Sequence, residues 1–387
     1  MSEAGKYTIT KTWVFSSEYI TTGTICPDGR LAVAHTYGFA RGYDQQWEQI
    51  PEVGEGRSGV RGLACDRDNR LWVAHYKGVS RYADGAWQTY GLDLLAMGEM
   101  VKEYVTTIVA APDGKIWALT PKGVALFTDE KWTIFQDGQG FIGIPSALAL
   151  DATGRPWVWV GDGVAVYENG NWKQFKTTAP TFPELISLDS RGWYWMGTFD
   201  KGVAVFDGAT WSSYNRDTQN LSNNRITALA TDSLGRVWAG TWYGLSVFDG
   251  SQWQTYRMDN ADLLDNRITF VAVERDGPTL PSPVEKQKGS LTGTLPIPGK
   301  RVELCSEAID NPSGNTPCAG QAFSMSTQSN NQGVFIFENI PPGYYYLIAE
   351  TGNGWAELFD QLGVFSEMVL IKPGELYDLG TLEFITN

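Results

Sequence analysis

The chain has 387 residues, with 44 acidic against 30 basic side chains and a formal net charge of −14 at pH 7. This charge repels a phosphate backbone or an anionic membrane, so we expect no nucleic acid partner. No segment approaches the roughly 18 apolar residues that a membrane-spanning helix needs, so we expect no direct membrane insertion. The 16 Trp, 17 Tyr, 17 Phe and 43 Gly residues favour strands and tight turns over helices.

One unit recurs at intervals of about 40 residues, which is typical of propeller blades. Each copy predicts four short strands. The first is apolar and ends at a turn with Asp and Gly, the second carries a Trp, and the third ends at an Asp-Gly or Asn-Gly hairpin. The outer strand has a Trp followed three residues later by another aromatic residue. The six copies are 22–50, which is degenerate, 60–90, 105–135, 145–175, 183–214 and 226–256.

These units predict an all-β fold, a β-propeller of six complete four-stranded repeats, in which large side chains fill the wedge between neighbouring sheets. We therefore interpret the Trp residues of the second strands as packing between blades first, and as ligand-stacking groups second. These residues are Trp72, Trp117, Trp157, Trp195 and Trp238.

Both ends of the repeat region carry further strands. Trp13 and Phe15 predict an outer strand, and the segment 267–277 repeats the first strand of the segment 225–235. We expect the two ends to meet as a reduced seventh blade, which would close the ring. A six-bladed ring with two peripheral strands is the alternative.

A change of composition follows the propeller, which we assign to residues 1–277. The Pro-rich segment 278–288 predicts a semi-rigid linker. From Gly289 to the end, at 387, alternating strands with Pro-Gly turns predict a small seven-stranded β-sandwich.

The four cysteines fall into two pairs. Cys305 and Cys318 flank a turn-rich segment, where a disulfide closes a short loop with little strain, and we expect them to be bonded. Cys26 and Cys65 lie at near-equivalent repeat positions one unit apart. For these two we favour separate small buried residues.

The only histidines, His35 and His75, end the second strand of neighbouring units, where the clearest copy has Thr241. Two imidazoles close together could hold a metal or act as a base. We favour duplication within the repeat, with each ring bonded to the backbone. Because no hydrolase, metalloprotease or nucleotide-binding motif is present, we expect no catalytic residue, no metal and no cofactor.

The turns between second and third strands should share one face with the connections between units. Aromatic rings with interspersed charges suit sugars, because the C–H faces of a sugar stack on aromatics while its hydroxyls find polar partners. The longest connection, 91–104, could overhang this face. A solvated rim without a ligand is the alternative. The candidate ligand-binding residues in these turns are Tyr37, Tyr76, Lys77, Lys122, Asp162, Phe199, Asp200, Lys201, Trp242 and Tyr243.

Arg225 and Arg267 complete the candidate set, because each directly precedes a first strand and should lie near the mouth of the central channel. Two guanidinium groups there would form a positive patch that matches carboxylates, which favours an acidic sugar such as a uronic acid. In the competing interpretation, each Arg pairs with a nearby acid and fixes its loop. The candidate acids are Asp259, Asp262 and Asp265.

The repeat, and most clearly the segment 232–250, resembles the two-component regulator propeller repeat, which occurs in periplasmic sensor regions of bacterial hybrid histidine kinases and in secreted proteins. The resemblance covers residues 22–277 and implies an extracellular or periplasmic location, with any export signal or anchor outside this sequence. Relatives that sense polysaccharide fragments imply carbohydrate as the first candidate ligand. Streptogramin lyases have a related propeller, but their set of His and Glu metal ligands has no counterpart that we can place here.

The segment 333–345, with its Ile-Pro-Pro-Gly core, resembles carboxypeptidase-regulatory-like, transthyretin-like domains, which are usually non-catalytic attachments to extracellular proteins. We therefore expect a non-catalytic, sensor-like propeller protein that binds an oligosaccharide or another polar small molecule. One alternative is a structural or protein-interaction scaffold of the cell envelope, with another envelope protein as partner. A second alternative is a metal-dependent enzyme that resembles streptogramin lyase.

Overall fold

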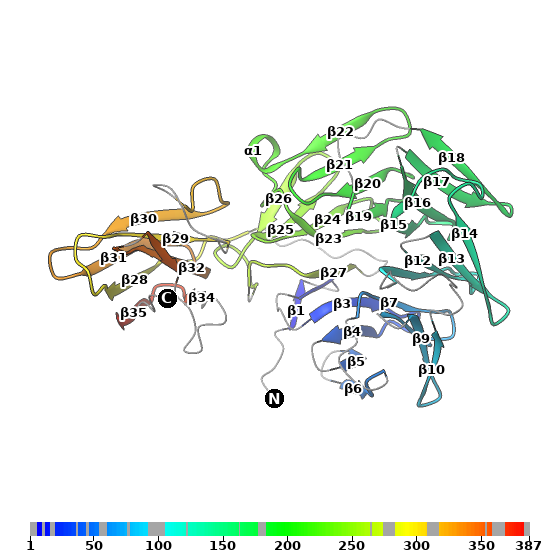
Figure 1. Ribbon diagram of the computed structural model, residues 1–387, viewed down its shortest axis with the longest axis horizontal. Coiled ribbons are helices and arrows are strands. Elements are labelled where there is room, and N and C mark those ends of the chain that lie inside the picture. The colour runs from blue at the N-terminus through cyan, green and yellow to red at the C-terminus, as the bar shows by residue number, and fades with distance from the viewer. Residues whose placement is uncertain are drawn as a thin grey trace. The chain divides into compact units, whose positions relative to one another are not determined.

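The computed structural model is all-β in the segments that it describes, apart from one helical turn, α1 (Arg216–Gln219) (Figure 1). No helix in those segments is long and apolar enough to cross a membrane. The described residues are 6–9, 12–15, 20–35, 38–43, 46–53, 60–75, 78–91, 105–120, 123–161, 163–176, 183–263, 265–273, 283–307, 317–352, 354–357 and 368–382.

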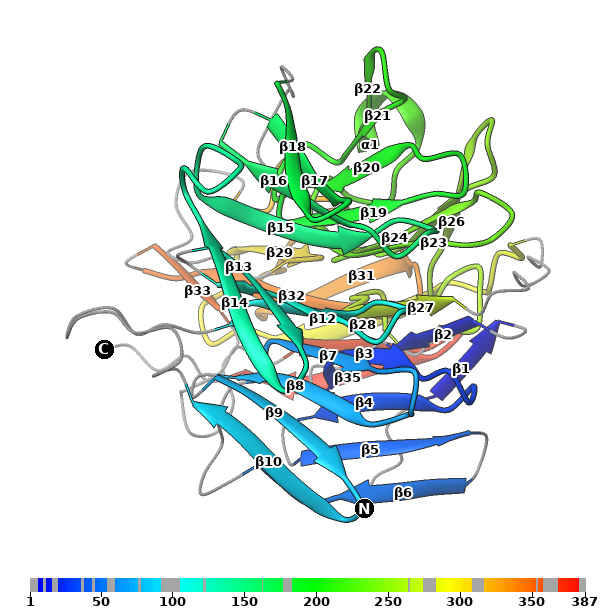
Figure 2. The same cartoon turned by 90° about the vertical axis from the view of Figure 1, so that its right-hand side faces the viewer.

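Six antiparallel four-stranded sheets, here called blades 1 to 6, account for the repeats within the described residues, and the strands of blade 1 lie side by side in chain order (Figure 2). Blade 1 has β3 (Ile20–Ile25), β4 (Leu31–His35), β5 (Gly38–Tyr43) and β6 (Gln46–Ile50), and blade 2 has β7 (Gly62–Cys65), β8 (Leu71–His75), β9 (Gly78–Ala83) and β10 (Ala86–Gly91). Blade 3 has β11 (Thr107–Ala110), β12 (Ile116–Thr120), β13 (Gly123–Thr128) and β14 (Lys131–Gln136), and blade 4 has β15 (Pro145–Leu150), β16 (Pro156–Val160), β17 (Gly163–Glu168) and β18 (Asn171–Lys176). Blade 5 has β19 (Leu185–Leu188), β20 (Tyr194–Gly197), β21 (Val203–Phe206) and β22 (Trp211–Tyr214), and blade 6 has β23 (Ile226–Thr231), β24 (Val237–Thr241), β25 (Gly244–Phe248) and β26 (Trp253–Tyr256).

A reduced seventh blade joins the two ends of the repeat region. It is a three-stranded sheet of β27 (Phe270–Val273), β2 (Thr12–Phe15) and β1 (Lys6–Ile9), in which β2 pairs antiparallel with β27. The expected closure is confirmed. The expected place of the 13–15 strand was wrong, because it pairs directly with the first strand of the blade, and β1 is outermost.

The first strands of all seven sheets contact one another in cyclic order, β3, β7, β11, β15, β19, β23 and β27, and β27 contacts β3. At that last contact the strands approach so closely that a Cβ on Gly23 would lie 2.8 Å from Cε1 of Phe270. The ring is therefore closed by contacts between first strands as well as by strand pairing in blade 7.

Four of the six four-stranded blades described, blades 2, 4, 5 and 6, are stabilised at the turn between their first two strands by what we call the Asp–Arg–Trp cluster. In blade 6, Oδ2 of Asp232 accepts hydrogen bonds from Nε1 of Trp238 at 3.1 Å and Nε of Arg236 at 2.6 Å. The Trp rings are buried between blades as expected, with Trp72, Trp117, Trp195 and Trp238 at most 1% exposed, whereas Trp157 is half-buried. The same cluster occurs in blades 2, 4 and 5 as Asp66–Arg70–Trp72, Asp151–Arg155–Trp157 and Asp189–Arg191–Trp195.

Two further sheets follow towards the C-terminus. One has the order β31 (Val334–Ile340), β28 (Gly289–Thr294), β35 (Leu376–Thr381). The other contains β30 (Ser324–Gln328), β29 (Arg301–Cys305), β32 (Gly343–Glu350) and β33 (Trp355–Glu357), with β34 (Met368–Ile371) also paired to β32. The alternating apolar residues of both sheets form one buried cluster, which includes Leu291, Leu304, Phe335 and Tyr345. The described residues thus form eight strands here, where the sequence predicts seven.

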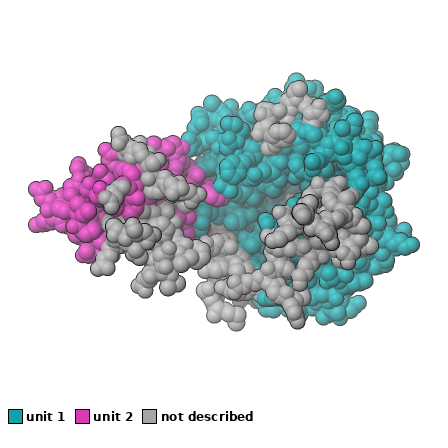
Figure 3. All heavy atoms as spheres, viewed as in Figure 1, with its two compact units in different colours: residues 1–241, 246–254, 267–281 teal, residues 242–245, 255–266, 282–387 magenta. Residues whose placement is uncertain are grey.

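The chain forms two compact units (Figure 3). Unit 1 comprises residues 1–241, 246–254 and 267–281, and unit 2 comprises residues 242–245, 255–266 and 282–387. The domain boundaries that the sequence suggests, at residues 277 and 289, stay a prediction.

All four cysteines are in disulfides. Cys305 is bonded to Cys318, as the spacing predicts. Cys26 is bonded to Cys65, so the expectation of two separate thiols was wrong. The two sulfur atoms meet because the end of the first strand of blade 1 lies against the end of the first strand of blade 2.

Candidate functional site

One end of the propeller unit brings together the turns between second and third strands and the connections between blades, and we call it the connection face. In blade 5 the amide of Gly202, in such a turn, donates to the carbonyl of Asn224, in the connection that follows, at 2.8 Å. The amide of Ile226 donates to the carbonyl of Thr198 at 3.0 Å. The expected sharing of one face is therefore present in blade 5.

The turn that carries three of the candidate residues is fixed by Thr198, which is buried. Its Oγ1 accepts a hydrogen bond from the amide of Lys201 at 2.9 Å and donates to the carbonyl of Gly202 at 2.8 Å. These two hydrogen bonds fix the backbone of the turn from which the candidate side chains project.

The central pair of the candidate site is Phe199 and Arg225. Phe199 is 51% exposed, and Cζ of the half-buried Arg225 lies 4.2 Å from the centre of its ring. This is the geometry of a cation–π contact. Beside them the exposed side chains of Asp200 and Lys201 form an ion pair at 3.3 Å. The structure therefore combines an exposed ring face, a guanidinium group and two surface charges.

Two of the three acids expected to pair with Arg225 and Arg267 form ion pairs with other residues. Asp259 lies 3.5 Å from Nε of Arg257, and Asp262 lies 3.1 Å from Nζ of Lys286, both within unit 2. Asp265 is buried, and Arg267 is half-buried. Ion pairs with Asp259 or Asp262 therefore do not explain what holds Arg225 and Arg267 in place.

Trp242 and Tyr243 belong to unit 2, and Trp242 is half-buried. Tyr243 is only 5% exposed, packs in the cluster of the C-terminal sheets, and its ring stacks on that of Phe323 at 6.4 Å. Burial raises the pKa of Tyr243 to about 12. The prediction that Tyr243 presents its ring to a ligand is not supported, because its faces are covered by protein.

Five candidates, together with the connection 92–104, lie outside the described residues. These candidates are Tyr37, Tyr76, Lys77, Lys122 and Asp162.

His75 and His35 occupy the position that is Thr120, Thr198 and Thr241 in other blades, three residues after the Trp position. His75 is buried, and its Nε2 lies 2.8 Å from Oγ of Ser80, which in turn lies 2.8 Å from Oγ1 of Thr89. The structure therefore gives His75 a side-chain hydrogen-bond partner, and a bond from each ring to the backbone stays a prediction.

Burial lowers the pKa of His35, while a hydrogen bond with Gln49 and the charge of Glu52 act in the opposite direction. In the part of the chain that the structure describes, no three His, Cys, Asp or Glu side chains are grouped so as to hold a metal.

The connection between blades 3 and 4 presents two aliphatic side chains that sequence reasoning missed. Ile142 is 73% exposed and Ile144 is 71% exposed. The side-chain amide of Gln174 bonds both the amide and the carbonyl of Ile142, and Asp137 accepts from the amide of Gly143. The signal available in the sequence was the group of three closely spaced glycines at 138, 140 and 143. In the structure each of them has a positive φ.

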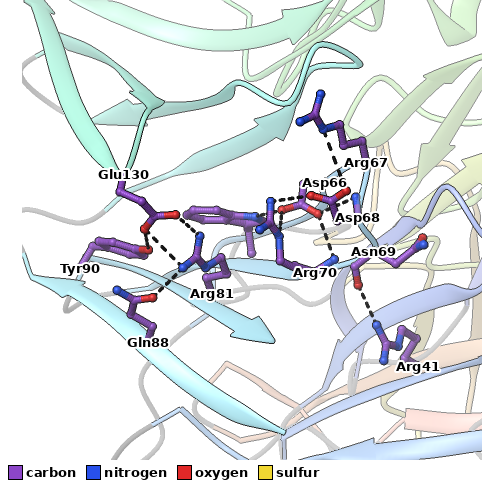
Figure 4. Close-up of polar contacts among 11 residues, drawn as sticks. Arg41, Asp66, Arg67, Asp68, Asn69, Arg70, Arg81, Gln88, Tyr90 and Glu130 are labelled. Carbon is purple, nitrogen blue, oxygen red and sulfur yellow. Dashed lines mark hydrogen bonds and ion pairs between the residues drawn. The ribbon is translucent and has the colours of Figure 1, made fainter. Parts of the chain in front are cut away.

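The opposite end of the unit, here called the hairpin face, carries the other turns, and Figure 4 shows a group of paired charges there. Arg81 bonds both oxygens of Glu130, at 2.6 and 3.3 Å, and Tyr90 donates to the same carboxylate at 2.9 Å. Because these groups are satisfied within the protein, the connection face is the better candidate for binding.

The ring of antiparallel sheets defines a β-propeller. Residues 220–243 match the family model for the two component regulator propeller. No curated protein sequence matches the chain.

Many solved structures have a similar fold, including two extracellular domains and a lyase. An extracellular domain assigned to the hybrid two component system BT3049 of B. thetaiotaomicron has a TM-score of 0.52 and 16% identity, over 95% of this chain and 56% of that domain. The corresponding domain of BT4673, from the same organism, has a TM-score of 0.50 and 14% identity, over 93% of this chain and 57% of that one. Virginiamycin B lyase from Staphylococcus aureus has a TM-score of 0.53 and 14% identity, over 67% of this chain and 92% of the lyase. This chain thus spans little more than half of the two extracellular domains.

Proposed function

We propose that this protein is a non-catalytic, extracytoplasmic propeller of the sensor type, which binds a carbohydrate or another polar ligand on its connection face. The observation that carries the proposal is the half-exposed ring of Phe199 beneath the guanidinium group of Arg225. The exposed part of the ring can contact the C–H face of a sugar, and guanidinium N–H groups can hydrogen-bond the oxygens of the sugar.

Three further observations support the proposal. The match to the two component regulator propeller favours a sensor-type module over an isolated enzyme, while the similar folds include both extracellular domains and a lyase. The two disulfides favour an oxidising compartment outside the cytoplasm. A positive group at the site of a protein with a net charge of −14 favours ligands that carry a carboxylate, such as uronic acid oligosaccharides.

The test is a glycan array of neutral and uronic-acid-containing polysaccharide fragments, followed by calorimetric titration of the best binder. Phe199→Ala should weaken binding about ten-fold, the effect of losing one stacked ring. The matched control is Leu234→Ala, because Leu234 is 66% exposed on the hairpin face and its loss should leave affinity unchanged.

Absence of any glycan binder would overturn the carbohydrate proposal. Equal affinity of wild type and Phe199→Ala for a glycan that does bind would overturn the site. Arg225→Ala separates the ligand classes, because it should lower the affinity for acidic oligosaccharides more than the affinity for neutral ones.

A second candidate function, protein interaction, is favoured by Ile142 and Ile144. Two exposed aliphatic side chains on a hydrogen-bonded connection offer no aromatic face and no polar group to a sugar. Under this alternative, a double Ile142→Ser/Ile144→Ser variant would lose capture of an envelope protein from the native organism, while glycan binding would stay the same.

A further inference from the structure

Blade 1 differs from blades 2, 4, 5 and 6 at the turn between its first two strands, where those blades have the Asp–Arg–Trp cluster. The amide of Cys26 donates to the carbonyl of Arg30 at 2.8 Å, and the carbonyl of Cys26 accepts from Gly29 at 2.9 Å. In blade 2, Asp66 makes the same two backbone bonds, with Arg70 and Asn69. Cys26 therefore stands at the position that Asp66 occupies in the Asp–Arg–Trp cluster.

The Trp of the cluster is also missing from blade 1. Ala32, which is fully buried, pairs with Thr24 as Trp72 pairs with Ala64 in blade 2. Arg30 bonds Asp28 instead, and that ion pair is partly exposed.

Blade 3 is an instructive comparison. Its equivalent position is Ala111, whose amide bonds the carbonyl of Lys115 in the same way, but the blade keeps Trp117. Among the six four-stranded blades described, blade 1 is thus the one in which both the Asp and the Trp are replaced.

The disulfide lies where the cluster is missing. Cys65 is the last residue of β7 and directly precedes Asp66, so the bond from Cys26 joins blade 1 to blade 2. Cys26 and Cys65 are 2% and 8% exposed, and their cluster includes Phe39 and Leu63. The two blades are also joined at Asn69, whose side chain accepts from the amide of Asp28 and whose carbonyl accepts from Arg41, and Arg41 and Asn69 are drawn in Figure 4.

Blade 1 also borders the seam of the ring, which we define as blade 7, where β2 pairs with β27. Its first strand, β3, contacts β27 on one side and β7 on the other. The neighbour of blade 7 is therefore a blade that lacks the Asp–Arg–Trp cluster and is held to blade 2 by a covalent bond.

We propose that the Cys26–Cys65 disulfide replaces the Asp–Arg–Trp cluster in blade 1, and that it makes stable closure of the ring dependent on an oxidising compartment. The bond closes a loop of 39 residues and restricts the unfolded chain accordingly. In reducing surroundings blade 1 and the seam open, while blades 4 to 6 keep their structure.

The test compares the full chain with two double variants, Cys26→Ala/Cys65→Ala and the matched control Cys305→Ala/Cys318→Ala. We expect the first to lower the melting temperature by on the order of 10 °C. Hydrogen exchange should rise at least about ten-fold in β3, β4 and β27 and stay near wild type in β19 to β22. The control should change exchange in β29 and leave blade 1 as it is.

A third variant keeps the proposal testable if the first does not fold. Cys26→Asp/Cys65→Ala supplies the carboxylate that the repeat uses at this position, and it should regain part of the lost melting temperature and protection. Exchange that rises uniformly around the ring, or that does not rise at all, would overturn the proposal. So would wild-type protein that refolds in dithiothreitol, with Cys26 and Cys65 found as thiols by mass spectrometry, and still shows native protection in β3 and β27.

Discussion

Asp151 accepts a hydrogen bond from the indole nitrogen of Trp157, with 3.0 Å between Oδ2 and Nε1. Burial would raise the pKa of Asp151, but hydrogen bonds from Thr153, Trp157 and Arg155 outweigh it and lower that pKa to about 2. The pKa in the folded protein is thus below the value of ~3.9 in an unfolded chain. The ionised carboxylate therefore stabilises the fold above about pH 4, and this stabilisation is lost as the pH falls from about 4 to 2.

We predict that Asp151→Asn lowers the free energy of unfolding at pH 7 by about 1 to 2 kcal/mol, a value discounted for solvent screening. Denaturant unfolding at several pH values between 7 and 2 measures the effect. The difference from wild type should narrow below pH 4 and be nearly absent at pH 2. A constant difference over this range would contradict the assignment, and Asp200→Asn, at an exposed position, is the control.

Tyr90 provides a second titration. Burial raises its pKa to about 12, with a further contribution from the hydrogen bond that it donates to Glu130. Glu130→Gln removes the negative charge, so the pKa of Tyr90 should fall by about one unit. Carbon-13 NMR of ring-labelled tyrosine across pH 9 to 12.5 measures this shift. A pKa that stays near 12 would show that burial alone sets it.

The turn of Phe199 should depend on the hydroxyl group of Thr198. Thr198→Val keeps the shape of the side chain but removes the bonds to Lys201 and Gly202, which should cost about 1 to 2 kcal/mol of folding free energy. Exchange of the Lys201 amide should become faster, and Thr198→Ser should restore most of its protection. Equal exchange in both variants would mean that Thr198 does not hold the turn.

His75 should be replaceable by the residue that other blades use. Because Thr120, Thr198 and Thr241 stand at the equivalent position, His75→Thr should change the free energy of unfolding by less than about 1.5 kcal/mol. His75→Leu should cost more, since Leu places a side chain with no hydrogen-bonding group beside the buried Ser80, whereas Thr keeps a hydroxyl group. Elemental analysis of purified wild type should find no metal in stoichiometric amount, and a bound metal lost in His75→Thr would contradict this structural role.

The blades could be predicted from the sequence because their signals are local. Alternating strands, Asp-Gly hairpins and the regular Trp each lie within a few residues of the structure that they specify. The strand order of blade 7 could not be predicted in the same way. Thr12–Phe15 pairs with Phe270–Val273, and no local pattern distinguishes a strand next to β27 from one at the edge.

Two errors at individual residues have the same origin. In blade 1 the turn between the first two strands has Asp28 and Gly29, a local pattern that hides the equivalence of Cys26 and Asp66, and the backbone bonds reveal that equivalence. Tyr243 and Phe199 look alike as aromatic residues in equivalent turns. Only the packing in unit 2 distinguishes the buried ring from the exposed one. For the candidate site, the sequence therefore supplied residue types, whereas exposure depends on contacts between distant segments.

The pairing of β2 with β27 also constrains how the protein is made. The partner of Thr12–Phe15 is synthesised only when the ribosome reaches Phe270, by which time blades 1 to 6 have been translated. At typical elongation rates this interval lasts on the order of 10 to 50 seconds. During it β1 and β2 can pair with each other, but the edge of β2 that later joins β27 stays open to pairing with other chains.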